Sequence, residues 1–240
     1  ACGAVVEAKD SAFEAIRQAL VDGVDLTEYD VQSLISQRLA EGGFETDHPA
    51  IVGVNAHSSD PHYAPVAGQS CLIRQGDWVL IDLWARRPGD SNVFADITWV
   101  ATVSAGIRPE QQQVFDIVRR ARDLIVDRLH EAWRVDEPLQ GHELDRLARD
   151  HIAGAGYGDR FLHRTGHSLS PGPAVHGLGA NLDDVESQDT RILLPGTGFT
   201  IEPGIYLDDF GVRLEINVYV DPKTGPTVTT PIQDKIVLLA

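Results

Sequence analysis

Residues 198–220 read GFTIEPGIYLDDFGVRLEINVYV, and this stretch decides the fold of the chain. Two runs rich in β-branched and aromatic residues, 198–207 and 212–220, flank a DDFG group that favours a turn, which predicts an antiparallel hairpin. Each run carries one glutamate among apolar residues, Glu202 in the first and Glu215 in the second. We expect the hairpin to bring the two carboxylates near each other, although the loop leaves their register open.

A second pair of predicted strands carries acids in the same way. WVLIDLWA (78–85) and VFADITWVATV (93–103) are separated by the turn-rich stretch RRPGDSN, and they contain Asp82 and Asp96. If the strands close about Gly89, the aspartates lie equally far from the turn and face each other on one side of the sheet. Two carboxylates that close repel each other unless a proton or a metal ion lies between them. For this pair alone, an exposed strand face with two ordinary aspartates is the alternative.

Helices are predicted where apolar residues recur at spacings of three and four, at residues 4–22, about 28–40, 110–133 and 142–155. Thr27 and Asp30 form a capping box at the start of the second helix, and Pro109 suits the first turn of the third. A final strand is expected at KIVLLA, residues 235–240. Because helices and antiparallel hairpins are mixed without a linker, we predict an α+β fold in which residues 1–240 form one domain.

The composition is that of an ordinary globular protein, with 42% hydrophobic and 23% charged residues. A net charge of −16 disfavours nucleic acids and anionic membrane surfaces as partners, because both would repel the chain. The chain has no run of about 18 apolar residues, so no membrane-spanning helix is predicted. Cys2 and Cys71 lie far apart, which favours a reducing compartment, and we expect a cytoplasmic protein. Because methionine is absent, we also expect a processed chain or a fragment of a longer one.

Four acids from two hairpins, joined by one histidine, would form a hard, oxygen-rich metal site. Such a donor set suits a pair of divalent ions such as Mn²⁺ or Co²⁺ better than a tetrahedral structural Zn²⁺. Carboxylates can bridge two ions about 3.5–4 Å apart, and such ions hold a hydroxide for hydrolysis.

Residues 163–177, HRTGHSLSPGPAVHG, contain three of the nine histidines. His163 and His167 are four residues apart, the spacing that turns two rings the same way on the helix of a zinc peptidase. The stretch is rich in glycine and proline and has no glutamate between the two histidines, so we reject that helical zinc site. The spacing alone leaves open whether the histidines bind metal, transfer protons or only form a loop.

Six stretches occur together and in a fixed order along the chain: PHYAP (61–65), GDWVLIDLWA (76–85), FADITW (94–99), HRTGH (163–167), FTIEPGIY (199–206) and GVRLE (211–215). In these stretches the chain resembles the catalytic domain of the pita-bread metallopeptidases, in the branch of aminopeptidase P and prolidase. The resemblance implies the pita-bread fold, a curved antiparallel sheet flanked by helices. It also implies hydrolysis of short peptides at N-terminal Xaa-Pro bonds, by an aminopeptidase or a dipeptidase.

By matching position, the resemblance implies five metal ligands, which are Asp82, Asp96, His167, Glu202 and Glu215. Asp82 would bind one ion, His167 and Glu202 the other, and the remaining two acids would bridge them. The implied cofactor is two divalent ions, with manganese preferred over cobalt, zinc or iron. A hydroxide between the ions would attack the scissile carbonyl, and Glu202 would pass a proton to the leaving nitrogen.

The same resemblance implies roles for four further residues. His62, His163 and His176 match histidines that contact the scissile group without binding metal, and Arg213 matches an arginine that supports the site. Longer members of the branch carry an N-terminal domain that helps dimerisation, which we expect to be missing here, so a homodimer stays open.

Several features depart from the family pattern. The path between the two aspartates is three residues longer than usual, and SPGP lengthens the path to His176 by two. Asn217 stands where an acid is common, and Trp84 and Ala85 replace small residues. Because these changes lie near the site, two alternatives stay open: a non-peptide hydrolase or lyase at the same metals, and a non-catalytic peptide-binding domain of the same fold.

Overall fold

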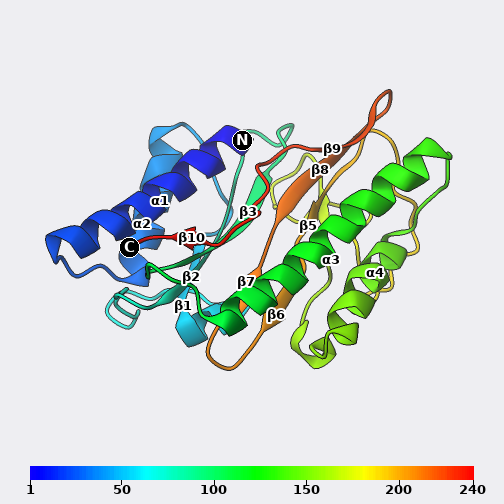
Figure 1. The fold of residues 1–240 in the computed structure, drawn as a ribbon. Coiled ribbons are helices and arrows are strands. Elements are labelled where there is room, and N and C mark those ends of the chain that lie inside the picture. The colour runs from blue at the N-terminus through cyan, green and yellow to red at the C-terminus, as the bar shows by residue number, and fades with distance from the viewer.

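Two groups of helices and strands make up the structure, a computed structural model that describes residues 1–240 (Figure 1). In the first half, two helices cover a four-stranded sheet with the strand order β1-β2-β3-β10. The helices of this half are α1 (Cys2–Asp22) and α2 (Glu28–Glu41). Its strands are β1 (Ile51–Val54), β2 (Trp78–Ala85), β3 (Ala95–Thr102) and β10 (Val237–Leu238).

The second half repeats the arrangement with two helices beside a four-stranded sheet ordered β4-β5-β8-β9 and a two-stranded sheet of β6 and β7. Its helices are α3 (Pro109–Arg134) and α4 (Gly141–Gly154). Its strands are β4 (Ser168–Leu169), β5 (Gly198–Ile201), β6 (Gly204–Tyr206), β7 (Gly211–Arg213), β8 (Ile216–Asp221) and β9 (Gly225–Val228). Short 3₁₀ helices occur at Asn55–Ser59 and Gly158–Arg160.

All four predicted helices are present, and their ends lie within two residues of the prediction. The capping box at the start of α2 is confirmed, because the Thr27 and Asp30 side chains each accept the other residue's backbone N–H. Gly23 ends α1 in the left-handed conformation, with φ of 64°, which costs glycine little. The helix boundaries therefore follow from local sequence.

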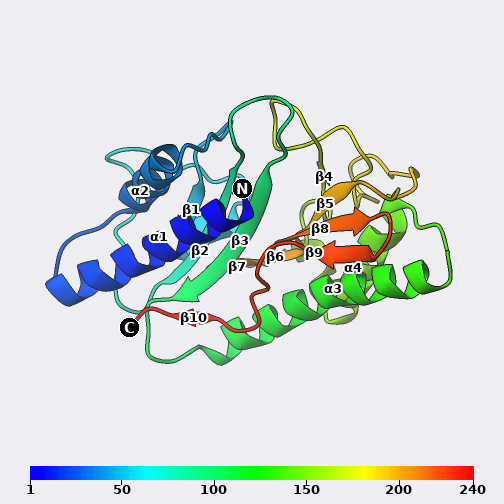
Figure 2. The same cartoon turned by 90° about the horizontal axis from the view of Figure 1, so that it is seen from above.

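Alternating side chains let β2 and β3 contribute to two separate cores. Val79 and Ile81 of β2 face α1 and α2 in one core, whereas Trp78 and Leu80 face the other core with α3, α4 and the second-half strands. Asp82 shares the second of these faces. The first-half acids therefore point toward the second half, and Figure 2 shows β3 beside β8 where the halves meet.

The predicted strands 198–207 and 212–220 are both interrupted, each into two shorter strands. The final strand is shorter than predicted, and it pairs parallel with β3. Strands β1, β4 and β9 were not predicted, because IVGV and SL are very short and GPTV contains a proline on an edge strand. The mixture of helices and mainly antiparallel strands confirms the α+β prediction. None of the helices combines the length and apolar character needed to cross a bilayer.

Candidate metal centre

The first-half aspartates lie two residues out of register on β2 and β3. Asp82 pairs with Thr98, and Asp96 pairs with Trp84. The expected direct pairing of the two aspartates is wrong, because the hairpin is centred one residue beyond Gly89. Both carboxylates still point to the same side, since positions two apart on a strand share a face.

Glu202 and Glu215 lie where the second-half strands are interrupted. The pairing of β5 with β8 and of β6 with β7 keeps one register across the gap, so the two glutamates lie opposite each other. Their expected proximity is confirmed, and the register left open by the sequence is now defined. Their backbone N–H groups bond to neighbouring segments, Glu202 to the Thr165 carbonyl at 2.7 Å and Glu215 to the Thr98 carbonyl at 3.2 Å. The interruptions thus attach each glutamate to another part of the site.

His167 is held against β5 by backbone contacts on both sides. Its N–H donates to Thr200 Oγ1 at 2.9 Å, and its carbonyl accepts from the Thr200 N–H at 2.8 Å. The preceding Gly166 approaches β5 so closely that a Cβ atom would lie 2.1 Å from the Thr200 carbonyl oxygen. Glycine is therefore required at this position of HRTGH, and it sets the place of His167.

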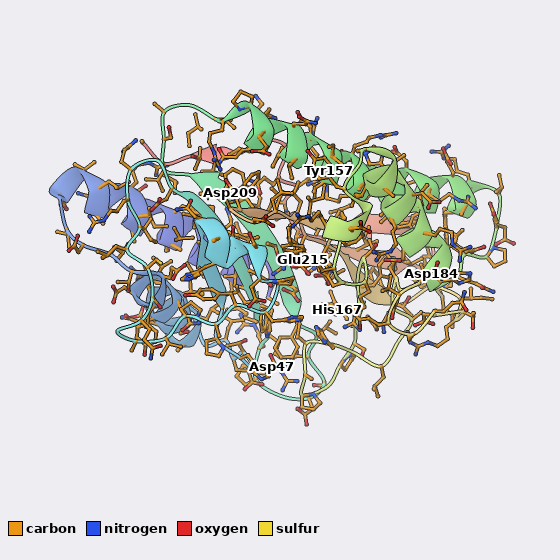
Figure 3. The ribbon with its side chains drawn as sticks, turned by 90° about the horizontal axis from the view of Figure 1, so that it is seen from below. Asp47, Tyr157, His167, Asp184, Asp209 and Glu215 are labelled. Carbon is orange, nitrogen blue, oxygen red and sulfur yellow. The ribbon has the colours of Figure 1, made fainter.

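The orientation of the His167 ring creates a site for a cation. Ring Nδ1 lies 3.2 Å from the Ser168 carbonyl oxygen, which only accepts, so Nδ1 carries the hydrogen. The lone pair of Nε2 then faces Asp96 Oδ2 at 3.3 Å and Glu202 Oε1 at 3.6 Å. Three electron-rich atoms converge there, so a proton or a metal ion is needed between them. Figure 3 shows His167 and Glu215 near the middle of the molecule, between the two halves.

Three buried carboxylate oxygens in this region have no hydrogen-bond partner: Asp82 Oδ1, Asp96 Oδ1 and Glu215 Oε1. Ligand atoms of Asp96, His167 and Glu215 all lie within 4.8 Å of one another. Buried acceptors are rarely left without partners in native proteins. The free oxygens and the imidazole lone pair together match the donor set of hard divalent ions.

Without a cation these acids resist ionisation. Burial, with Asp82 as the next cause, raises the pKa of Asp96 well above its usual range. Burial also raises the pKa of Glu215 well above normal and that of Glu202 to about 7, while nearby acids add to both shifts. Burial lowers the pKa of His167, which keeps the ring neutral and its lone pair free. The residues present therefore fit divalent metal.

Arg213 lies beside the acids and holds three groups. Its guanidinium donates to Asp82 Oδ2, to Thr98 Oγ1 at 3.1 Å and to the Tyr206 hydroxyl oxygen at 2.8 Å. Burial raises the pKa of Tyr206 to about 12, so the hydroxyl keeps its hydrogen. The sequence interpretation overlooked Tyr206, although it lies two positions after Gly204 and four after Glu202, a spacing that strand alternation places on one face.

His163 has both ring nitrogens engaged. Nδ1 donates to the Arg164 carbonyl at 2.7 Å, and Nε2 accepts from the Tyr206 hydroxyl at 2.6 Å. Burial, followed by the charge of Arg213, lowers the pKa of His163 to about 3, so the ring is neutral. A chain of hydrogen bonds therefore runs from Arg213 through Tyr206 to His163. The predicted contact of His163 with the scissile group requires Nε2 to leave Tyr206.

The lengthened SPGP loop still brings His176 to the acids. Its ring lies 4.3 Å from that of His167, centroid to centroid, and is tilted by 52°. The loop is anchored on both sides, because Val175 N–H donates to Asp47 Oδ2 at 3.1 Å and Gly177 N–H donates to the Ser168 carbonyl at 2.7 Å. The ring therefore lies beside that of His167 despite the extra residues.

His62 is exposed at the edge of the site on a loop that a buried glutamate organises. Glu28, at the start of α2, accepts from Tyr63 Oη at 2.7 Å, from Cys71 N–H at 2.8 Å and from His57 Nδ1 at 2.9 Å. Sequence interpretation left His57 without a role and overlooked Glu28, since no local pattern marks a glutamate whose partners lie 26–43 residues away.

One cavity of about 740 Å³ collects every predicted site residue. Its lining includes His62, Asp82, Asp96, His163, His167, His176, Glu202, Arg213 and Glu215. It also includes residues that the sequence interpretation did not assign to the site, among them Asp47, Arg164 and Glu186. The two halves thus converge on one acid-lined hollow large enough for a short peptide.

Residues 1–222 match the model of metallopeptidase family M24. The chain belongs to metallopeptidase family M24. It is 34% identical over 201 residues to the uncharacterized peptidase YqhT of Bacillus subtilis, covering 83% of this chain and 51% of that protein. The chain spans about half the length of the curated relatives that it matches.

Two solved structures resemble this M24 chain over nearly its whole length. The prolidase of Thermococcus sibiricus superposes with a TM-score of 0.76 at 27% identity, covering 97% of this chain and 58% of that one. The X-Pro aminopeptidase of Thermotoga maritima gives a TM-score of 0.78 at 26% identity, covering 98% and 61%. The predicted family and the pita-bread fold are confirmed by these matches.

Proposed function

We propose that the chain is a metal-dependent peptidase that cleaves short peptides at N-terminal Xaa-Pro bonds, as an aminopeptidase or a dipeptidase. The observation that carries the proposal is the convergence of the His167 lone pair with buried, partnerless carboxylate oxygens at one cavity. The names of the relatives support the peptide class, since they include a prolidase and an X-Pro aminopeptidase. We propose residues 1–240 as one catalytic domain.

Five residues would hold two divalent ions: Asp82, Asp96, His167, Glu202 and Glu215. When bound, the ions would polarise the scissile carbonyl and activate a water molecule for attack. We propose manganese first, with cobalt, zinc or iron as alternatives, because oxygen-rich sites accept several divalent ions. The donor set does not select among them.

The chain's own groups would handle the proton and the substrate. Glu202 is the candidate to receive a proton and pass it to the leaving nitrogen, because its carboxylate lines the cavity beside His167, where the scissile group would lie. Arg213 fixes Asp82 and the Tyr206 hydroxyl, and Tyr206 in turn occupies Nε2 of His163. These contacts would keep the floor of the cavity fixed while the peptide binds.

The same cavity would also receive the rest of the peptide. Apolar groups lining it include Ile51, Pro65 and Trp84, a surface that suits a proline ring. Proline also lacks a backbone N–H, so a site for it needs no acceptor at that position. His62 and His176 are candidates to donate hydrogen bonds to the substrate from the cavity edge.

The test combines metal analysis with a peptide digest. Protein purified without chelator should contain up to two divalent ions per chain, and none would contradict the metal site. Metal-loaded protein should cleave Xaa-Pro peptides much faster than matched Xaa-Ala peptides, read by mass spectrometry. Equal rates would contradict the Xaa-Pro preference, and no cleavage of any peptide would favour a non-peptide reaction or a binding domain. A cytoplasmic location and a homodimer stay predictions.

A further inference from the structure

We propose that Arg164 is a positioning residue that holds the imidazole of His176 with its Nε2–H directed to the substrate. The proposal rests on the proposed function for its catalytic consequence, but not for its structural basis. Arg164 lies in the HRTGH stretch, immediately after His163, and its side chain lines the cavity.

The contact between the two side chains settles which nitrogen of His176 carries the hydrogen. Arg164 Nη2 lies 3.3 Å from Nδ1 of His176. A guanidinium has only donors, so Nδ1 must accept and hold the lone pair. The hydrogen of the neutral ring is then on Nε2, which makes that nitrogen a donor. This is the side chain's only hydrogen bond to the protein, so nothing else fixes the ring's hydrogen.

Arg164 is itself fixed by a turn that crosses the rim of the cavity. Its Nη1 lies 3.2 Å from Glu186 Oε2, and its side chain is 18% exposed. Glu186 is placed by the buried Asp183, whose carboxylate accepts the Glu186 N–H at 2.8 Å and the Ser187 hydroxyl at 2.6 Å. A continuous series of contacts thus runs from Asp183 through Glu186 and Arg164 to His176.

The position of the hydrogen matters because Nε2 of His176 would act on a substrate oxygen in opposite ways as a hydrogen-bond donor and as an acceptor. The His176 ring packs beside that of His167 and lines the cavity, and Nε2 has no partner in the protein, so this nitrogen is free to bind a substrate oxygen. An Nε2–H donor stabilises negative charge that develops on a carbonyl oxygen, whereas an Nε2 lone pair would repel it. The lengthened loop fixes the backbone on both sides of His176, and Arg164 fixes the ring.

The structural part of the proposal is tested by long-range ¹H–¹⁵N NMR on zinc-loaded protein near neutral pH. The His176 signals are identified by their loss in His176→Gln. We expect one tautomer in the wild type, with the hydrogen on Nε2 and Nδ1 as a hydrogen-bonded acceptor. The double variant Arg164→Glu with Glu186→Arg exchanges the charges and places an acceptor beside Nδ1, so it should move the hydrogen to Nδ1. A wild-type hydrogen on Nδ1, or no change in the double variant, would overturn the proposal.

The catalytic part is tested by comparing two arginines that bind the same turn. Arg146 pairs with Asp184 at 2.7 Å, two residues from Glu186, and does not contact His176. Arg164→Met should lower kcat by about 10- to 100-fold with little change in KM, because it weakens the orientation of one donor to the reacting oxygen. Arg146→Met should stay within about twofold of the wild type, because Arg146 does not contact His176.

Equal kcat values for the two methionine variants would overturn the role of Arg164. If Arg164→Met does not fold, the wild-type tautomer and the charge exchange still decide the proposal. A wild-type protein without peptidase activity would overturn the proposed function, while the NMR result would decide the placement of His176 on its own.

Discussion

The two halves of the molecule supply acids to one cavity in different ways. Asp82 and Asp96 lie on strands that run through the site without interruption, and strand alternation alone places them. Glu202 and Glu215 lie between short strands, so their backbone N–H groups leave the sheet and bond to Thr165 and Thr98. A regular strand fixes the direction of a side chain, whereas an interrupted strand also connects it to a neighbouring segment.

The interruption also joins the halves. Glu215 reaches β3 twice, because its N–H donates to the Thr98 carbonyl and its Oε2 accepts from Thr98 Oγ1 at 2.8 Å. Two residues further on, the Asn217 amide accepts the Asp96 N–H at 2.9 Å and donates to the Asp96 carbonyl. A carboxylate at position 217 has no N–H to donate to the Asp96 carbonyl, so asparagine suits this contact between the halves.

The largest effect is expected for Glu202, and its comparison with Asp82 separates a role in proton transfer from a role in metal binding. Glu202→Gln should lower turnover by about 10²- to 10⁴-fold even at saturating metal, because the amide cannot carry the proton. Asp82→Asn in the first half should lose activity that excess metal restores in part, because it removes a charge from the ligands. The measurement is kcat across a metal titration, with thermal unfolding of both variants as the control. Recovery of the Glu202 variant in excess metal would remove Glu202 from proton transfer.

The next largest effect is expected from breaking the joint between the halves, which is the set of hydrogen bonds from Asp96 and Thr98 of β3 to Glu215 and Asn217. Asn217→Leu keeps the branching of the side chain but leaves the buried N–H and carbonyl of Asp96 without partners. We expect the free energy of unfolding to fall by about 3 kcal/mol, measured by urea denaturation. Asn92→Leu is the matched control, because Asn92 bonds to the Pro88 carbonyl within an exposed loop. An equal effect of the two substitutions would show that the joint does not depend on Asn217.

A third prediction concerns pH and the charge of the acids. In metal-free protein the pKa of Glu202 is raised from 4.5 to about 7. The folded protein therefore binds the Glu202 proton more tightly than the unfolded chain does. That contribution to stability is present below pH 4.5 and is lost as the pH rises through about 7. Each such proton changes the free energy of unfolding by about 1.4 kcal/mol per pH unit in this window.

Bound metal should reverse the trend, because divalent ions require ionised carboxylates. Unfolding temperatures of stripped and manganese-loaded protein, compared at successive pH values, should therefore diverge as the pH rises toward neutrality. A difference that stays constant with pH would mean that the buried acids are not the metal ligands.

The sequence predicts most of the fold because the signals involved are local. Apolar spacing, the Thr27 capping box and Pro109 place the helices, and apolar strands with isolated acids identify Asp82, Asp96, Glu202 and Glu215. The offset of the aspartates was missed because it depends on one residue in the centre of a long loop. Contacts between distant segments, such as Arg164 with Glu186, have no local pattern and appear only when the chain is folded.

The smallest expected effect comes from two buried threonines, Thr98 on β3 in the first half and Thr200 on β5 in the second. Thr98 Oγ1 donates to Glu215 and accepts from Arg213, so it connects β3 to the second half. Thr200 Oγ1 donates to Glu202 at 3.0 Å and accepts from the His167 N–H at 2.9 Å, so all of its contacts stay within the second half.

Replacement of either threonine by valine keeps the shape of the side chain and should lower the free energy of unfolding of metal-free protein by about 1–2 kcal/mol. Metal affinity should separate the two variants. Thr98→Val releases two groups across the joint and should weaken metal binding by about tenfold in competition with a chelator. Thr200→Val should weaken it less, because the bond from the Thr200 N–H to the His167 carbonyl remains. Equal losses of affinity would mean that the Thr98 hydroxyl contributes no more to metal binding than the Thr200 hydroxyl does.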